Sequence, residues 1–210
     1  QLAPSSILVW KATSLDGHAI FSVASSPTTP AGAWGTIDGV KDWAVNGSQL
    51  IYTLDTGTGL RVCSRPLSNL AVAPSCLMAW AGSHGDYVTY VFAVGSSAFV
   101  HVVGTDVNAW YLWNGSTVVG VQVPSGSTID SAFWGDTFVV VRDADSVPSL
   151  RKVNDNGTLG AVVPNPATAV SAIEGLAVAP GRIIGADNSD ASNQTFPAWS
   201  RTVSGSAFGA

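Results

Sequence analysis

The chain has 210 residues, and its 9 Lys and Arg against 14 Asp and Glu give a net charge of −5. The basic residues form no cluster that could neutralise a row of phosphates, which argues against nucleic acid as a partner. A single Glu, three Lys and one Met leave few of the residues that favour helices, whereas Val, Thr, Ser and Gly are abundant. The composition therefore predicts one all-β domain over residues 1–210, a length that can bury a substantial core.

Strands rich in β-branched and aromatic residues recur roughly every 40–50 residues. They begin near Ile7, Leu50, Tyr87, Phe138 and Arg182. Each is followed by a tip rich in Asp, Gly or Ser and then by a second strand, and four are preceded by a tight turn and another apolar segment. These four segment pairs read DWAVNGSQLIYTL, MAWAGSHGDYVTY, SAFWGDTFVVV and GLAVAPGRIIGAD. The pattern predicts a five-bladed β-propeller of about 42 residues per blade, with a β-sandwich as the alternative.

The uncharged stretch 87–105 has the length of a membrane span, but Gly95, Ser96 and His101 interrupt it and β-branched residues dominate. We expect a hairpin there and no membrane span. The chain starts at Gln1 without an apolar leader, as a mature secreted protein does after signal cleavage. We also expect the two termini to pair in one blade, because this would remove an open sheet edge.

Cysteines and glycosylation patterns favour an extracellular protein. Cys63 and Cys76 lie close enough in the sequence for a disulfide within one repeat, with two buried free thiols as the alternative. Four Asn-X-Ser/Thr sequences fall in expected turns or hairpin tips and match the N-glycosylation pattern: Asn46, Asn114, Asn156 and Asn193. Together these features predict a secreted, disulfide-bonded glycoprotein.

Patterns for metal binding are weak. The three histidines are far apart in the sequence and fit no zinc pattern: His18, His84 and His101. Two Asp-rich tips place oxygen atoms at alternate or near-alternate positions, Asp143 with Asp145 and Asp187 with Asp190, but neither completes a calcium loop. Solvated hairpin tips are the preferred interpretation, and we predict neither a metal nor a cofactor.

Three acidic residues are the candidates for catalytic groups. Glu174, Asp42 and Asp130 precede comparable inner strands and could form a ring of carboxylates of the kind that glycosidases use. The alternative is that they are solvated residues at strand entries, because the same position in the other repeats is not acidic. We prefer this alternative and predict no catalytic residue.

Aromatic residues give the best indication of function. Trp43, Trp80 and Trp134 precede corresponding turns, so we expect them to be equivalent core residues. A second set falls outside this repeated position and adjoins polar residues, as in carbohydrate sites where a sugar stacks on a ring: Trp110, Tyr111, Trp113 and Trp199, with Asn108. Packing between blades is the alternative explanation for this set.

The strand pair LIYTLDTGTGLRVCSRPL and the alternation of inner segment, turn and hairpin resemble the repeats of secreted fungal β-propeller lectins, including the fucose-binding type. Those lectins hold each sugar with an Arg, a Glu and a Trp from each repeat. Arg61 is followed by no matching Glu, so these binding residues do not transfer to this chain.

The resemblance implies a secreted, extracellular, carbohydrate-binding protein without catalytic activity, monomeric or weakly associating, that recognises glycans of a cell surface or cell wall. Two alternatives remain open. One is a glycoside-acting propeller enzyme that uses Glu174 with an Asp, and the other is a structural or surface-assembly protein.

Overall fold

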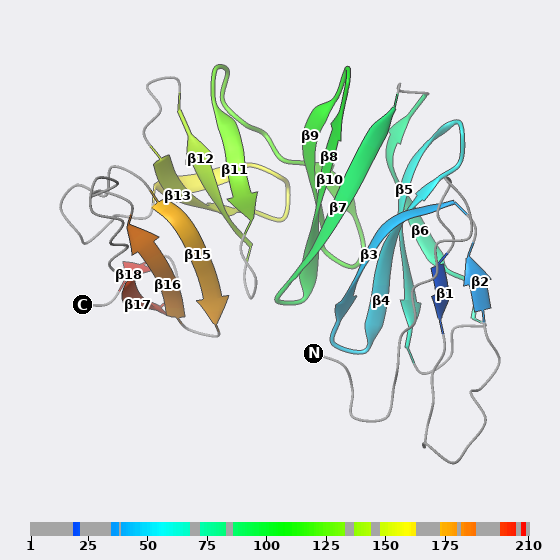
Figure 1. Cartoon of the computed structure of the whole chain (residues 1–210), viewed down its shortest axis with the longest axis horizontal. Helices are drawn as coiled ribbons and strands as arrows, with labels where there is room; N and C mark the ends of the chain where they lie inside the picture. Colours follow the sequence, from blue (N-terminus) through cyan, green and yellow to red (C-terminus); the bar gives the residue numbers. More distant parts are fainter. Residues whose placement is uncertain are drawn as a thin grey trace, which may run out of the picture. The chain divides into compact units, whose positions relative to one another are not determined.

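A computed structural model describes eleven parts of the chain: residues 19–21, 35–37, 39–67, 72–82, 86–132, 137–143, 148–162, 173–179, 182–187, 198–204 and 207–208. All regular elements in these parts are β-strands, and none is a helix (Figure 1). This confirms the all-β prediction. The chain forms two compact units, Gln1–Gly120 and Val121–Ala210.

The first unit contains one two-stranded and two four-stranded antiparallel sheets. The two-stranded sheet pairs β1 (Ala19–Phe21) with β2 (Gly35–Ile37). The next sheet has the order β3 (Val40–Asn46), β4 (Gln49–Asp55), β5 (Gly59–Pro66) and β6 (Ser75–Ala81). The last consists of β7 (Tyr87–Val94), β8 (Ser97–Gly104), β9 (Asn108–Trp113) and β10 (Val118–Gly120), again in chain order.

The second unit contains two further four-stranded sheets with the same simple order. One consists of β11 (Thr128–Ala132), β12 (Phe138–Arg142), β13 (Pro148–Val153) and β14 (Leu159–Val162). The other consists of β15 (Ile173–Ala179), β16 (Arg182–Asp187), β17 (Ala198–Ser204) and β18 (Ala207–Phe208). Because β18 pairs with β17, the described residues near the C-terminus complete their own sheet.

A β-bulge recurs in the first strand of three sheets. The register shifts between Val40 and Asp42 in β3, between Ile129 and Ser131 in β11, and between Ile173 and Gly175 in β15. The extra residues are Lys41, Asp130 and Glu174. A bulge is a specific local feature, so its recurrence in the same strand indicates that these sheets repeat one structural unit.

Three of the four predicted hairpins are confirmed, as β3–β4, β11–β12 and β15–β16. The fourth, MAWAGSHGDYVTY, is wrong because MAWA ends β6 and YVTY begins β7, and these strands belong to different sheets. Tyr87 therefore starts a first strand, whereas Leu50, Phe138 and Arg182 lie at the start of second strands. The repeat at Tyr87 is displaced by one strand from the predicted alignment, and Ile7 lies outside the described residues.

The stretch 87–105 forms the predicted hairpin, β7–β8. Its two-residue turn places Gly95 at φ 55°, and the β3–β4 turn places Gly47 at φ 57°, a left-handed conformation that glycine adopts without steric cost. In the described part of the chain, no helix is long and apolar enough to cross a membrane.

The core of the first unit lies on both faces of the β3–β6 sheet. One face contributes Leu50, Tyr52 and Cys63 to a cluster that also includes Ile37 of β2. The other face packs on the β7–β10 sheet, and the buried residues of this contact are Ile51, Leu60, Val62, Val91, Ala98, Val100, Val102 and Trp113. The two four-stranded sheets are therefore stacked face to face within this unit.

The three expected core tryptophans are not equivalent. Trp43 lies on β3, in the first of these clusters, whereas Trp80 lies on β6, the last strand of the same sheet, and packs in the second. Both are half-buried, and Trp80 lies 5.4 Å from the ring of Tyr87 and 5.7 Å from that of Tyr111. The equivalence of Trp43 and Trp80 is thus wrong, because these residues lie on the first and fourth strands of one sheet and pack on its opposite faces. Trp134 lies outside the described residues.

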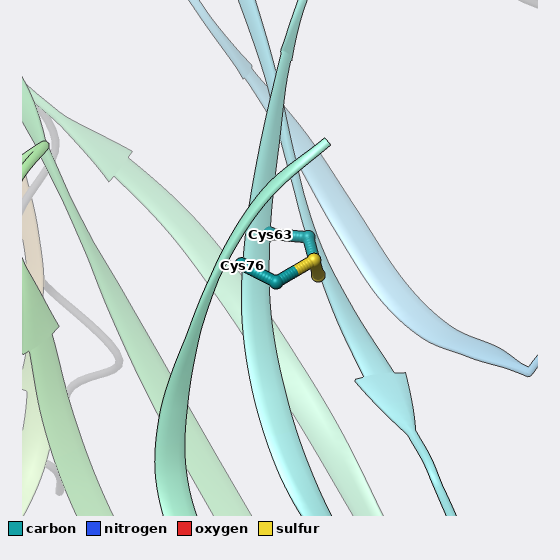
Figure 2. Close-up of a disulfide and its surroundings, with 2 residues drawn as sticks. All are labelled: Cys63 and Cys76. Atoms are coloured by element: carbon teal, nitrogen blue, oxygen red, sulfur yellow. A yellow bond between two sulfur atoms is a disulfide. The ribbon is translucent and has the colours of Figure 1, made fainter. Parts of the chain in front are cut away.

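The disulfide Cys63–Cys76 is present, as predicted. The two residues are direct register partners on β5 and β6, with a Cα–Cα distance of 4.1 Å. Figure 2 shows the two side chains meeting between these neighbouring strands. The bond therefore ties the fourth strand of the sheet to the third.

Candidate functional site

The predicted aromatic cluster of NAWYLW is divided by strand geometry. Successive side chains of a strand point to opposite faces, and β9 is a regular strand. Asn108 and Trp110 therefore share one face of the sheet, and Tyr111 and Trp113 share the other. Trp199 lies on β17, and its side chain lies outside the described part of the chain.

Trp113 and Tyr111 pack between the two stacked sheets. Trp113 is 6% exposed and belongs to the cluster formed with Ile51, Leu60 and Val62. Tyr111 is half-buried against Trp80. For these two residues the structure favours the packing explanation over an open binding platform.

The opposite face of the β7–β10 sheet carries a row of three rings. Tyr90 of β7 is the register partner of His101 of β8, which is in turn the partner of Trp110 of β9. His101 stacks on Trp110 with ring centroids 4.0 Å apart and planes 8° apart, and the Tyr90 ring lies 6.1 Å from that of His101. Phe92 and Phe99 adjoin the Trp110 ring at 5.9 and 6.2 Å. We refer to Tyr90, His101 and Trp110 as the ring row.

One end of the ring row is open to solvent. Tyr90 is 48% exposed, whereas Trp110 is 7% exposed. Asn108 is exposed, and its Oδ1 lies 2.9 Å from Nε2 of His101. An exposed phenol ring, an imidazole and an amide therefore lie together on one face of the sheet.

The imidazole of His101 is held neutral. Burial lowers its pKa below the ordinary value, and the hydrogen bond with Asn108 opposes this effect only in part. A neutral ring that donates its Nε2 proton to Oδ1 of Asn108 satisfies the observed contact. Stacking on Trp110 and bonding to Asn108 together fix the orientation of the ring.

Sequence reasoning placed Asn108 and Trp110 in the site but missed Tyr90 and His101. These two residues are separated by a turn in the sequence and become neighbours only through the β7–β8 register. No family model, curated protein or solved structure matches this chain. Assignment of a ligand therefore depends on the geometry of the ring row itself.

Asp42, one of the candidate acids, has a structural role. It is half-buried, and its Oδ2 accepts a 2.7 Å hydrogen bond from the backbone N–H of Val91 in the adjacent sheet. Beside it the Thr53 hydroxyl lies 2.8 Å from that of Thr89, so a polar seam joins the two sheets. Burial raises the pKa of the Asp42 carboxyl, although its bonds to backbone N–H groups oppose the rise.

Asp130 and Glu174, the other two candidate acids, are the extra residues of the bulges in β11 and β15. Their side chains lie outside the described part of the chain. The described side chains therefore do not test the ring of carboxylates, which stays the alternative to the predicted absence of a catalytic residue.

Truncation of Asp42 tests this structural role. Asp42→Ala leaves the buried N–H of Val91 without its acceptor, so we expect the free energy of unfolding to fall by about 1–3 kcal/mol. Asp42→Asn keeps an acceptor oxygen and should cost less. Urea titration of the two variants measures the difference, and equal losses would contradict the assigned hydrogen bond.

The described residues include no group of three or more His, Cys, Asp or Glu side chains placed to hold a metal ion. Asp143 is exposed directly after β12. The other residues of the histidine set and of the Asp-rich tips have side chains outside the described part: His18, His84, Asp145, Asp187 and Asp190.

Proposed function

We propose that this chain is a lectin-like protein that binds carbohydrate on the open end of the ring row. The supporting observation is that the half-exposed ring of Tyr90 lies on the same face as the exposed amide of Asn108, with His101 between them. The apolar face of a pyranose packs on an aromatic ring, and its hydroxyls need fixed polar partners nearby. Tyr90 would supply the first of these and Asn108 the second.

The site is ordered before any ligand arrives. His101 is clamped between the Trp110 ring and the Asn108 amide, so neither polar group has to be immobilised on binding. Ordering of this kind lowers the entropic cost of association. Because the site offers one exposed ring and few polar groups, we expect weak binding at one site and specificity that depends on few hydroxyls.

A five-bladed β-propeller is the architecture that we propose for the whole chain. In its support, four sheets are four-stranded meanders, three of them share the first-strand bulge, and two stack face to face. In the stacked pair the first strands β3 and β7 are neighbours, as the inner strands of adjacent blades would be. The β1–β2 sheet would belong to the fifth blade.

Secretion is part of this proposal. The Cys63–Cys76 disulfide fits an extracellular protein, since such bonds persist in oxidising compartments. The expected resemblance to secreted fungal β-propeller lectins points in the same direction. Because the sugar-binding trio of that family is not matched, the ring row would be a binding surface of a different kind.

A glycan array probed with the labelled chain tests the proposal. For any glycan that binds, Tyr90→Ala should weaken binding by about tenfold or more, because the ring is the stacking surface. The melting temperature should change little, since Tyr90 is 48% exposed. Met78→Ala is the matched control, because Met78 is 45% exposed on β6, in the neighbouring sheet, and should leave binding unchanged.

Two results would favour the alternatives. Hydrolysis of a glycoside that disappears with Glu174→Gln would support the enzyme. Concentration-dependent assembly that is lost with Tyr90→Ala, in the absence of glycan binding, would support the surface-assembly protein. Binding that survives both Tyr90→Ala and Asn108→Ala would remove the ring row as the site.

Stability should depend on pH through His101. Because its pKa is lowered in the folded chain, protonation favours the unfolded state. The contribution of the neutral imidazole is fully present above the usual pKa of about 6.5 and is lost as the pH falls from there through the lowered pKa. Urea midpoints measured between about pH 7 and pH 5 should therefore fall more for the wild type than for His101→Gln. Parallel curves for the two proteins would contradict the burial of a neutral His101.

A further inference from the structure

Three Asn-Gly-Ser/Thr sequences lie at hairpin turns in the described part of the chain. Residues 46–48 join β3 to β4, residues 114–116 lie between β9 and β10, and residues 156–158 lie between β13 and β14. The last two occupy the same turn, from third to fourth strand, in two different sheets. All three match the same glycosylation pattern, but their Asn side chains make different hydrogen bonds in the structure.

In the two third-to-fourth turns, the Asn side chain is held through its oxygen. Oδ1 of Asn114 accepts hydrogen bonds from the backbone N–H and the hydroxyl of Ser116, both at 3.1 Å. Oδ1 of Asn156 accepts the corresponding bonds from Thr158, at 3.1 and 2.6 Å. In both turns the hydroxyl of the third residue therefore contacts the amide oxygen of the first.

Asn46 is held in the opposite way, through its nitrogen. Its Nδ2 donates a 2.7 Å hydrogen bond to the backbone carbonyl of Ser97 on the adjacent sheet. Asn46 is half-buried and Ser97 is 7% exposed. A sugar on Nδ2 would have to enter the contact between the two sheets, so the folded chain does not accommodate a glycan on this nitrogen.

We infer that a chain carried through a eukaryotic secretory pathway folds with N-linked glycans at Asn114 and Asn156 and with an unmodified Asn46. The donor is a lipid-pyrophosphate-linked oligosaccharide. In the transfer the bond from sugar C1 to the pyrophosphate oxygen breaks and a bond from C1 to Asn Nδ2 forms. Nδ2 gives up one proton to a base, and the lipid pyrophosphate leaves, without any change of oxidation state.

The placement leaves the ring row free. Asn114 directly follows the last residue of β9, whereas Asn108 begins that strand and Tyr90 lies on the same face. A glycan on Asn114 would thus project from the opposite end of the sheet from Asn108. The inference does not depend on carbohydrate binding, and either can fail alone.

Mass spectrometry of the secreted chain tests this inference. The chain is fused to a signal peptide, expressed in a eukaryotic host, and trimmed with an endoglycosidase that leaves one N-acetylglucosamine on each occupied Asn. We expect this remnant on the peptides of Asn114 and Asn156 and not on that of Asn46. The remnant, unlike an Asn-to-Asp mass change, cannot arise from spontaneous deamidation of Asn-Gly.

Sequon variants give a matched control. Ser116→Ala and Thr158→Ala should each remove one glycan, and Ser48→Ala should remove none. The same peptides are measured in the secreted pool and in any pool retained in the cell. Occupied Asn46 in the secreted chain, or an unmodified Asn114 or Asn156 in both pools, would overturn the inference.

Discussion

Replacement of Trp113 with Ala should lower the free energy of unfolding by about 3–5 kcal/mol, as for other large aromatic residues in cores. Trp113 is 6% exposed and packs among Ile51, Leu60 and Val62 across the contact between two sheets. Its register partners on the neighbouring strands are Ala98 and Val118, which are too small to fill the space that the indole leaves. The truncation therefore creates a cavity as well as a loss of buried apolar area.

Urea denaturation of Trp113→Ala beside Tyr90→Ala measures the effect against a matched aromatic truncation in the same sheet. Tyr90 is 48% exposed, so its loss should change stability by far less. The opposite pattern would be informative. If Trp113→Ala kept full stability and lost glycan binding, the indole would be a binding platform, as the sequence suggested, and the packing between the sheets would need another explanation.

Local patterns in the sequence were sufficient to predict strands and most hairpins. The sequences NGS and APG separate apolar segments that do pair, in β3–β4 and β15–β16. Such sequences predict reversals because Gly and Pro favour turn conformations. The disulfide was also predictable, since the two cysteines are close in the sequence and even in number.

The assignment of strands to sheets was harder to predict from the sequence. Both β7 and β8 are apolar and β-branched, so the pattern does not distinguish a first strand from a second. The strand β6 is followed directly by Gly82, as the first strand of a hairpin often is, so the local pattern predicts a pairing between strands that belong to two different sheets. Only the hydrogen-bonded register separates a hairpin from a crossover.

The candidate site was predictable only in part, for a similar reason. Trp110, Tyr111 and Trp113 are close together in the sequence. Side chains alternate along the strand, however, so Trp110 lies on one face of the sheet and Tyr111 and Trp113 lie on the other. Tyr90 and His101 are eleven positions apart in the sequence and meet because both hairpin strands are regular. A site assembled across strands leaves no local signature in one sequence.

Removal of the disulfide should have the second largest effect on stability. Cys63 and Cys76 are 13 positions apart in the sequence. In the chain-entropy description, closing a loop of that length raises the free energy of the unfolded chain by about 3 kcal/mol. The double variant Cys63→Ala/Cys76→Ala should lose about this much free energy of unfolding while keeping its fold, because the neighbouring register pairs of β5 and β6 remain.

The loss of stability should be largest in β6. Among the described strands, β6 is the last of its sheet and pairs with β5 alone, so the disulfide cross-links this edge strand to the sheet interior in addition to the main chain. Hydrogen exchange in the double variant should accelerate at the amides of β6 and much less at those of β4, which is paired on both sides. The reduced wild type serves as the control for the Ala side chains and should show the same pattern. Uniform acceleration of amide exchange across β3–β6 would mean that the disulfide stabilises the sheet as a whole. If neither the exchange rates nor the urea midpoint changed, strand pairing alone would hold β6 in place.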